Sequence, residues 1–482
     1  MIRPLRRMTL LLGLLFFSLL VQATRVQVIE ARHLQTDTGN IRPIIAQYGR
    51  ERGAILVGPA PVARSVDTGD ARLRYERRYP MGPLYSAATG FYSLVYGATG
   101  IERAEDPILS GTDPRLLGSQ FSDLIQGQAR KGGSVLLTLN AAAQQAAYDG
   151  LRKYRGAVVA IEPSTGRILA LVSSPSFDPN PLSANNAKTE TTAWNAYTKD
   201  SNQPLLNRPL AKTYPPGSSF KIVTAAAALS SGKYTMTTEI PAPAALQLPQ
   251  STKKLPNYDN RPCFGGKVTL EQALQISCNT AMANVGLTLG DQTLREQAEK
   301  FGFNHTFQVP MTAAQSVFPA DLNAPQTALA AIGQYDVRAT ALQMAMVAAG
   351  VANHGLVMKP YLVEQVNGPD LAPLSRTEPQ EFDQAVTPLV ASELTAMLVN
   401  VVDNGTGRPA RIPGVQVAGK TGTAQTSPGH PPHAWFVAFA PAQDPKVAVA
   451  VVVEDGGNLG SEATGGKLSA PIAKAVIQAV LK

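Results

Sequence analysis

Several features that mark other protein classes are scarce in this sequence of 482 residues. Only 16% of the residues are charged, five are histidines and two are cysteines. Apolar residues make up 44% and the mean hydropathy is close to zero, which fits a folded soluble body and excludes a protein with many membrane spans. The basic residues form only short pairs such as Arg77-Arg78, and no basic run with interleaved aromatics predicts binding to nucleic acid.

A metal centre is not predicted either. His430 and His433 lie in and just past the turn between Pro428 and Pro432. A metal site needs a further ligand, and none is close in the sequence, so we interpret both histidines as turn residues. No cofactor is predicted. The net charge of +8 instead suggests an anionic neighbour, such as a membrane surface or an acidic polymer.

One apolar run, at residues 9–21, follows three arginines near the N-terminus. The basic flank predicts a cytoplasmic N-terminus and an exported body. The run is short for a full span, and Val21-Gln22-Ala23 resembles a cleavage site. We favour an uncleaved anchor over a cleaved signal peptide, and both alternatives export the body.

The two cysteines are Cys263 and Cys278. Thiols of an exported protein can oxidise, so a disulfide between them is one expectation. Two unrelated buried thiols are the alternative, and the sequence leaves both open.

Beyond the anchor, the sequence predicts two bodies, a small mixed domain over residues 25–150 and a larger one over 151–482. Apolar runs at 157–161 and 167–172 flank a turn and predict a hairpin. Two helices at 269–290, the first with a capping box at its start, precede an antiparallel meander. The full set is a strand at 135–139 followed by a helix, the hairpin, a helix at 218–231, a loop at 232–263, two helices at 269–290, strands at 415–424, 434–440 and 447–454, and a helix at 468–482. This order indicates an α+β fold, with helices packed on a mostly antiparallel sheet and an all-helical subdomain.

The pattern Ser-x-x-Lys occurs at Ser218, Ser230 and Ser251. Only Ser218 follows a rigid Tyr-Pro-Pro-Gly turn and starts an apolar helix. Residues i and i+3 share a helix face, so Lys221 can reach the Ser218 hydroxyl. A serine hydroxyl needs an adjacent base to become a nucleophile, and burial with the helix dipole favours a neutral lysine. The alternative is an ordinary N-cap serine.

Two further motifs also lie where the predicted secondary structure suits a functional site. Ser277 and Asn279 lie in the break between two predicted helices, where a loop can aim them into a cleft; the alternative is a helix cap. The sequence Lys420-Thr421-Gly422-Thr423 lies within a predicted strand, and its lysine and threonines can hold a carboxylate. Glycine in a strand indicates a close approach of a ligand or another backbone, although an edge strand with a protective lysine is the alternative.

Together, these motifs form the signature of penicillin-binding proteins and serine β-lactamases. The chain resembles the class B penicillin-binding proteins, close to the penicillin-binding protein A group of cell-division transpeptidases. The resemblance covers nearly the whole length and includes residues 97–111 and 156–178, Asn207-Arg208, Gly465-Gly466 and Ala470-Pro471. It implies a penicillin-binding, serine-β-lactamase-like domain with an antiparallel sheet between helices, a smaller N-terminal pedestal or dimerisation-like domain, and a membrane anchor at residues 1–24.

The resemblance also implies acyl transfer and a role for each motif residue. Ser218 would attack the penultimate D-Ala carbonyl of a peptidoglycan stem peptide after activation by Lys221. Ser277 and Asn279 would assist proton transfer and hold the peptide. The carboxylate-binding group would be Lys420, Thr421, Gly422 and Thr423, and the backbone N–H groups of Ser218 and Thr423 would form the oxyanion hole.

Partners and location follow from the same resemblance. It implies a single-pass protein of the cell membrane with an extracytoplasmic catalytic domain. β-Lactams would be covalent inhibitors, and proteins of the cell-division complex are hypothetical partners.

Other functions share parts of the motif set. A class A β-lactamase needs a Glu-x-x-Leu-Asn element after the Ser-x-Asn motif, and the nearest string, at 271–275, precedes Ser277 and ends in glutamine. A D,D-carboxypeptidase stays open, because a water acceptor changes no motif. A non-catalytic scaffold of the division complex and a β-lactam sensor are disfavoured by the intact motifs and the single anchor, respectively.

Overall fold

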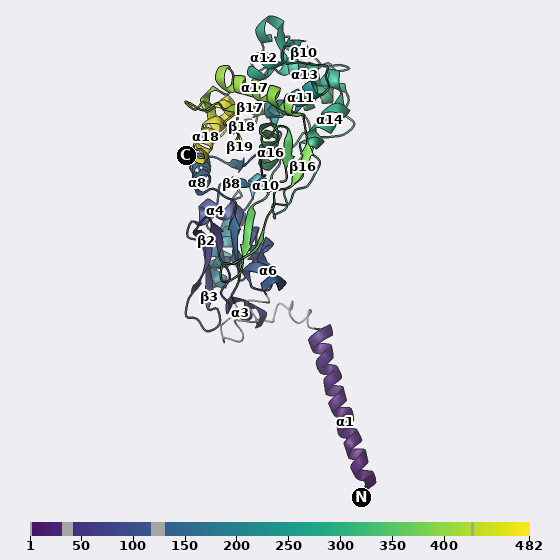
Figure 1. Ribbon diagram of the computed structural model, residues 1–482, viewed down its shortest axis with the longest axis vertical. Coiled ribbons are helices and arrows are strands. Elements are labelled where there is room, and N and C mark those ends of the chain that lie inside the picture. Colours follow the sequence, from purple (N-terminus) through teal and green to yellow (C-terminus); the bar gives the residue numbers. More distant parts are fainter. Residues whose placement is uncertain (1, 31–41, 117–130, 426–428) are drawn as a thin grey trace.

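The computed structural model describes residues 2–30, 42–116, 131–425 and 429–482 (Figure 1). Helix α1 (Ile2–Thr24) continues without interruption into a π-helical turn, Arg25–Ile29. Within it, residues 6–29 form a 24-residue helix that is apolar and long enough to cross a membrane, and it is fully exposed. The helix is therefore longer than the predicted apolar run. The sequence of residues 25–33 predicts a linker helix or strand after the anchor; the structure is helical up to Ile29, and residues 31–33 lie outside the described residues.

The N-terminal body is built on a six-stranded sheet with the order β15-β14-β6-β1-β2-β3. Strand β1 pairs in parallel with β6, and the other neighbours are antiparallel. The two outer strands β14 and β15 come from residues 363–376, and in Figure 1 this green pair descends into the purple and blue lower body. The strands are β1 Ile55–Val57, β2 Ala60–Asp67, β3 Tyr75–Arg78, β6 Ser134–Leu137, β14 Val363–Asn367 and β15 Pro373–Arg376.

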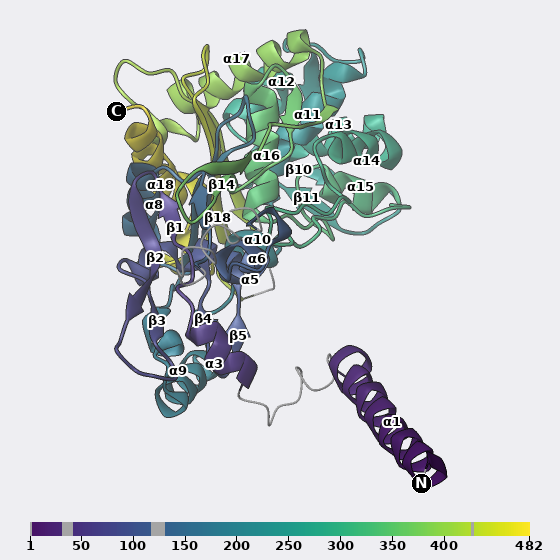
Figure 2. The same ribbon diagram turned by 60° about the horizontal axis from the view of Figure 1, so that its bottom comes forward.

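Short elements complete this body. Figure 2 shows α9 beside the N-terminal strands, where Trp194 of α9 stacks on Tyr96 with ring centroids 4.4 Å apart. The remaining elements here are α3 Arg42–Tyr48, α4 Gly82–Thr89, β4 Tyr92–Ser93, β5 Gly97–Ala98, α5 Gly100–Ala104, α6 Asp106–Leu109 and α9 Ala187–Lys199.

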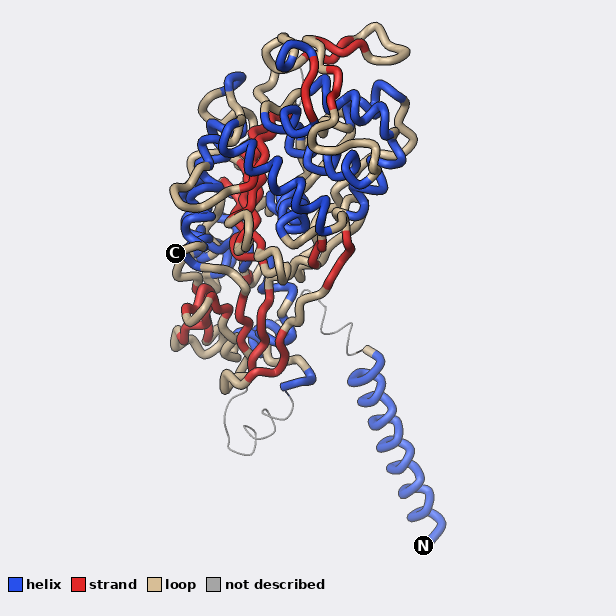
Figure 3. Tube along the Cα trace, turned by 45° about the horizontal axis from the view of Figure 1, so that its top comes forward, coloured by secondary structure: helices blue, strands red, loops and turns tan. Residues whose placement is uncertain are grey.

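The larger body contains a five-stranded antiparallel sheet with the order β17-β18-β19-β7-β8. Successive residues of each strand point to opposite faces, and both faces are covered, so two interior strands, β7 and β19, carry no polar side chain. Val158 and Val449 pack toward α8 and α18, whereas Val159 and Ala450 pack toward α16. Figure 3 shows these strands in red between blue helices. The elements are β7 Gly156–Ile161, β8 Ile168–Ser174, β17 Ala418–Ala424, β18 His433–Ala440, β19 Val447–Val453, α8 Ala141–Leu151, α16 Ala341–Ala352 and α18 Gly465–Val480.

A helical region lies next to β17 and centres on α11, whose residues are buried from Lys221 to Leu229. The helices are α11 Lys221–Ser230, α12 Leu270–Gln275, α13 Asn279–Leu289, α14 Asp291–Lys300, α15 Ala324–Ala330 and α17 Pro388–Asn404, whereas the short helix α10 Arg208–Ala211 packs on β7 and β8. Three short strand pairs accompany them: β9 Glu239–Pro241 with β12 Lys267–Thr269, β10 Ala245–Gln247 with β11 Lys254–Pro256, and β13 Leu356–Met358 with β16 Glu381–Gln384.

The α+β fold, the hairpin, the meander and the two helices at 269–290 agree with prediction, and both hydrogen bonds of the Thr269–Gln272 capping box are present. Three details differ. The segment 232–263, predicted as loop, contains β9, β10 and β11, whose three-residue length gives no sequence periodicity. The predicted helix at Ser218 begins as a 3-10 turn, Gly217–Phe220. Helix α18 begins at Gly465, just after its cap Thr464, rather than at residue 468.

Candidate active site

Ser218 lies in the 3-10 turn that leads into α11, and it is half-buried. The turn lies against β17. Gly217 has φ +53°, and a Cβ atom there would be 2.7 Å from the Thr423 carbonyl oxygen. Its N–H donates to the Gly333 carbonyl at 2.9 Å. A residue with a side chain would therefore push Ser218 away from the strand, so glycine is required here.

Lys221 is the first residue of α11, and it is fully buried. Its Nζ donates to the Ser277 carbonyl oxygen at 2.8 Å and to Asn279 Oδ1 at 2.7 Å. Burial, and after it the nearby Lys420 ammonium, lowers the pKa of Lys221 well below its ordinary value. A neutral amine has two N–H donors and one lone pair. With both donors engaged, the lone pair is free to accept a proton.

Ser277 sits between α12 and α13 in the left-handed backbone region, with φ +62°. This conformation costs a non-glycine residue roughly 1–2 kcal/mol. The local hydrogen bonds Ser277 N–H to the Leu274 carbonyl (3.1 Å) and Cys278 N–H to the Ala273 carbonyl (2.8 Å) hold it. The hydroxyl accepts from Lys420 Nζ at 2.9 Å and lies 3.4 Å from Lys221 Nζ, so it lies between the two lysines.

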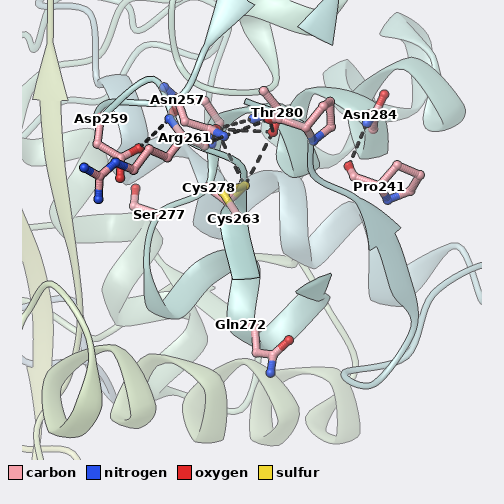
Figure 4. Close-up of a disulfide and its surroundings, with 12 residues drawn as sticks. Pro241, Asn257, Asp259, Arg261, Cys263, Gln272, Ser277, Cys278, Thr280 and Asn284 are labelled. Atoms are coloured by element: carbon pink, nitrogen blue, oxygen red, sulfur yellow. Dashed lines mark hydrogen bonds between the residues drawn. A yellow bond between two sulfur atoms is a disulfide. The ribbon is translucent and has the colours of Figure 1, made fainter. Parts of the chain in front are cut away.

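A disulfide joins Cys278, the middle residue of this motif, to Cys263 (Figure 4). Cys263 begins a short 3-10 segment, Cys263–Gly266, and both cysteines are buried. The bond attaches the Ser277–Asn279 loop covalently to the segment before β12.

Lys420 lies on β17, which is the edge strand of the five-stranded sheet. Its Nζ donates to Ser277 Oγ and to the Thr421 carbonyl, both at 2.9 Å. Burial lowers the pKa of Lys420 to about 7. The Thr421 hydroxyl is hydrogen-bonded to Thr406 at 2.6 Å, and Thr423 is half-buried.

Gly422 lets β17 approach the Ser218 turn. A Cβ atom at Gly422 would be 2.8 Å from Trp435 Cβ and 3.2 Å from the Ser219 nitrogen. The prediction that this glycine indicates close backbone contact agrees with this geometry.

The structure thus brings all eight predicted motif residues to one place, from the α11 start, the α12–α13 loop and β17. The other two Ser-x-x-Lys pairs are not part of it. Lys233 and Lys254 are exposed, Ser230 ends α11 on the surface, and the Ser251 hydroxyl accepts a local N–H from Lys253.

A buried carboxylate that the sequence analysis did not identify supports the turn before Ser218. Glu454, just after β19, accepts hydrogen bonds from Arg208 Nε (3.0 Å), the Tyr214 hydroxyl (2.8 Å) and Lys212 Nζ (2.8 Å). Burial alone would raise the pKa of Glu454, but these partners lower it below its ordinary value. The only sequence signals were the Asn207-Arg208 resemblance and the position of Tyr214 directly before the Pro-Pro-Gly turn.

Two aromatic rings complete this support. Trp435 Nε1 donates to the Pro215 carbonyl at 3.0 Å, and its ring meets Tyr214 edge-on. His433 also meets Tyr214 edge-on, and its Nδ1 accepts the Asp455 N–H at 3.1 Å. The interpretation of both histidines as turn residues is wrong for His433, which is the buried first residue of β18, whereas His430 is exposed in a bend. Among the described residues no group of three or more potential metal ligands occurs.

The comparisons with known proteins agree with this geometry. Residues 156–478 match the penicillin binding protein transpeptidase domain, and residues 52–135 match the penicillin binding protein A dimerisation domain. The chain is 46% identical to the peptidoglycan D,D-transpeptidase PbpA of Mycolicibacterium smegmatis and 45% identical to that of Mycobacterium tuberculosis, each over 99% of both chains.

Solved structures show the same similarity. The ceftriaxone acyl-enzyme complex of penicillin-binding protein A from M. tuberculosis superimposes with a TM-score of 0.89 at 45% identity, covering 91% of this chain and 100% of that one. Its penicillin G acyl-enzyme complex gives a TM-score of 0.86 at 45% identity, over 90% and 100% of the chains. The chain therefore belongs to the class B penicillin-binding proteins, in the penicillin-binding protein A group.

Proposed function

We propose that this chain is a peptidoglycan D,D-transpeptidase that cross-links stem peptides through an acyl-enzyme on Ser218. The observation that carries the proposal is the buried Lys221 amine. Its two donors are engaged by the Ser277 carbonyl and Asn279 Oδ1, and its low pKa supports a free lone pair for the Ser218 proton.

In the proposed acylation, the Ser218 proton passes to Lys221 as Oγ bonds to the penultimate D-Ala carbonyl carbon. The negative charge on the carbonyl oxygen would be held by the N–H groups of Ser218 and Thr423. The C–N bond to the terminal D-Ala then breaks. Its nitrogen takes a proton from Lys221 by way of the Ser277 hydroxyl, which lies 3.4 Å from Lys221 Nζ.

The proposed second step transfers the acyl group to an amine of a neighbouring strand. The amine attacks the Ser218 ester, loses its proton through Lys221, and Ser218 recovers its hydrogen as the ester C–O bond breaks. Because β17 is an edge strand, its free edge supports pairing with an extended stem peptide. Lys420, Thr421 and Thr423 would bind the peptide carboxylate, with Gly422 allowing close approach. A β-lactam would acylate Ser218 by opening its ring amide.

A labelled penicillin tests the site. The expected result is one covalent adduct on Ser218, found by mass mapping, and no adduct in Ser218→Ala. An adduct on another residue, or equal labelling of Ser218→Ala, would refute it. Products formed with a real acceptor strand then distinguish cross-linking from hydrolysis: release of D-Ala without a cross-linked product would assign a carboxypeptidase.

We also propose the chain's topology and division. Helix α1 would anchor the protein as a single span, with residues 1–24 as cytoplasmic tip and anchor and the rest outside the cytoplasm. Residues 25–150 would form the pedestal, joined by the β14–β15 pair, and residues 151–482 the transpeptidase domain. Protease added to intact spheroplasts should digest the body; protection of the body would refute this orientation.

Cell-division proteins are the proposed partners. Binding of these partner proteins to this chain should require the N-terminal body. A fluorescently labelled chain should concentrate at the division site. Uniform distribution over the membrane of dividing cells would contradict this role.

A further inference from the structure

Asn257 lies just after β11, at the N-terminus of α13, and it is 5% exposed. Its Oδ1 accepts hydrogen bonds from the backbone N–H groups of Asn279 and Thr280, each at 3.1 Å. It also accepts from the Thr280 hydroxyl at 3.2 Å. Figure 4 shows Asn257 pointing at Thr280 beside the disulfide.

The other end of the Asn257 amide is also fully engaged. Nδ2 donates to the Pro243 carbonyl and to the Arg261 carbonyl, both at 2.9 Å. These two acceptors fix which end of the amide is nitrogen, so Oδ1 must face the helix.

Helix α13 needs this external acceptor. The first N–H groups of a helix have no partner within it, and a cap residue normally supplies one. The residue in the cap position, Cys278, makes no side-chain cap hydrogen bond, and its sulfur is in the disulfide. Asn257 supplies the missing acceptor from a different segment.

The neighbouring residue acts on the Asn279 side chain. The Pro256 carbonyl accepts from Asn279 Nδ2 at 3.2 Å. With Nδ2 held there, Oδ1 of Asn279 faces Lys221 Nζ at 2.7 Å. Residues 256 and 257 therefore hold both the backbone and the side chain of the residue that contacts Lys221.

We propose that Asn257 is a positioning residue for Lys221: it fixes the start of α13 so that the Ser277 carbonyl and Asn279 hold the amine, and its amide must be neutral. Aspartate caps helices as well as asparagine does, and a negative charge suits a helix N-terminus. At this position, however, the charge would lie beside Asn279, which contacts Lys221. A negative charge there would favour the protonated form of Lys221. The inference rests on the proposed function, in which neutral Lys221 is the base.

The charged groups around this point come from several elements. Lys420 faces Lys221 from β17. Arg261 and Asp259 lie in the turn after β11, where the Arg261 N–H donates to Asp259 Oδ1, and Lys254 is exposed on β11. A carboxylate at 257 would face the start of α13 directly, because the Asn257 side chain accepts from the Asn279 and Thr280 N–H groups.

The test compares Asn257→Asp, Asn257→Ser and Asn257→Ala with Asn260→Asp, which adds the same charge to an exposed residue of the same turn. Full-length protein is acylated with labelled penicillin from pH 5 to 10, and thermal unfolding is recorded for each variant. We expect Asn257→Asp to move the acid limb of the pH profile of acylation upward by about one pH unit. At pH values below that limb, acylation should then be roughly tenfold slower than in the natural chain. Asn257→Ala should be about tenfold slower with the limb unmoved, Asn257→Ser should retain most of the rate, and Asn260→Asp should stay within twofold of the natural chain.

An unmoved acid limb in folded Asn257→Asp, or an Asn257→Ala rate within twofold, would overturn the inference. If Asn257→Asp does not fold, Asn257→Ala and Asn257→Ser decide: equal rates would overturn the positioning role, and rescue by serine would support it. Labelling of the natural chain at a residue other than Ser218 would refute the proposed function instead, so the two failures are distinguishable.

Discussion

Replacing Tyr214 by phenylalanine removes a single hydroxyl from the support of the Ser218 turn. The hydroxyl donates to Glu454 at 2.8 Å, and the Tyr214 residue is 1% exposed. A hydrogen bond to a charged group contributes about 1.5–3 kcal/mol to stability. Glu454 keeps Arg208 and Lys212 as partners, so we expect a loss of about 2 kcal/mol in the free energy of unfolding.

The same substitution should slow acylation. Tyr214 is followed directly by Pro215, whose carbonyl accepts a hydrogen bond from Trp435. The turn that carries Ser218 begins two residues later, at Gly217. A shift of about 1 Å in a reacting group can cost roughly 100-fold in rate. We expect a smaller shift here, and a decrease of about tenfold in the second-order rate constant for labelled penicillin.

Tyr197→Phe is the matched control. Tyr197 lies on α9, outside the active site. The Tyr197 hydroxyl donates to the backbone carbonyl of Asp178, an uncharged acceptor, at 3.1 Å. Its loss should cost about 0.5–1.5 kcal/mol and leave acylation unchanged. If urea unfolding and acylation of Tyr214→Phe match those of this control, the support assigned to Glu454 and Tyr214 is refuted.

Three further predictions concern Lys420, Gly422 and the disulfide. Burial lowers the pKa of Lys420 to about 7, so the unfolded state binds more protons than the folded state between about pH 7 and 10, and this group makes stability rise with pH in that window. Lys420→Met should reduce the slope of stability against pH there and abolish acylation; an unchanged slope would contradict the assignment. Gly422→Ala would place Cβ 2.8 Å from Trp435 Cβ, so acylation should fall more than 10-fold; a rate within twofold would show that β17 adjusts freely. The Cys263–Cys278 bond closes a loop with a sequence separation of 15, so its reduction should cost about 3 kcal/mol; non-reducing mass mapping that finds two free thiols would contradict the bond itself.

The elements that the sequence predicted are those whose signals are local. Apolar runs separated by a turn predicted β7 and β8, and the capping box predicted the start of α12. The motif residues were placed by their immediate context, namely a rigid turn, an interhelical break and a strand. Each such signal lies within a few residues of the element it predicts.

What the sequence did not predict depends on contacts between distant segments. Asn257 caps a helix that begins 22 residues later, at Asn279. Glu454 accepts hydrogen bonds from the segment 208–214, which is 240 to 246 residues away in the sequence. The left-handed backbone of Ser277 has no signature, because serine rarely adopts it and tertiary contacts impose it. These three features surround the candidate active site, and each follows from the assembled fold.

The β14–β15 pair has a consequence for the order in which the protein can be made. Strand β6 lies between β1 and β14, so the N-terminal sheet lacks strands β14 and β15 until residue 376 has been synthesised. Until then, β6 presents an open edge of unpaired backbone groups. The N-terminal body is thus first in the chain but cannot complete its fold until most of the second body has followed it, and a fragment ending at residue 150 would leave that edge open permanently.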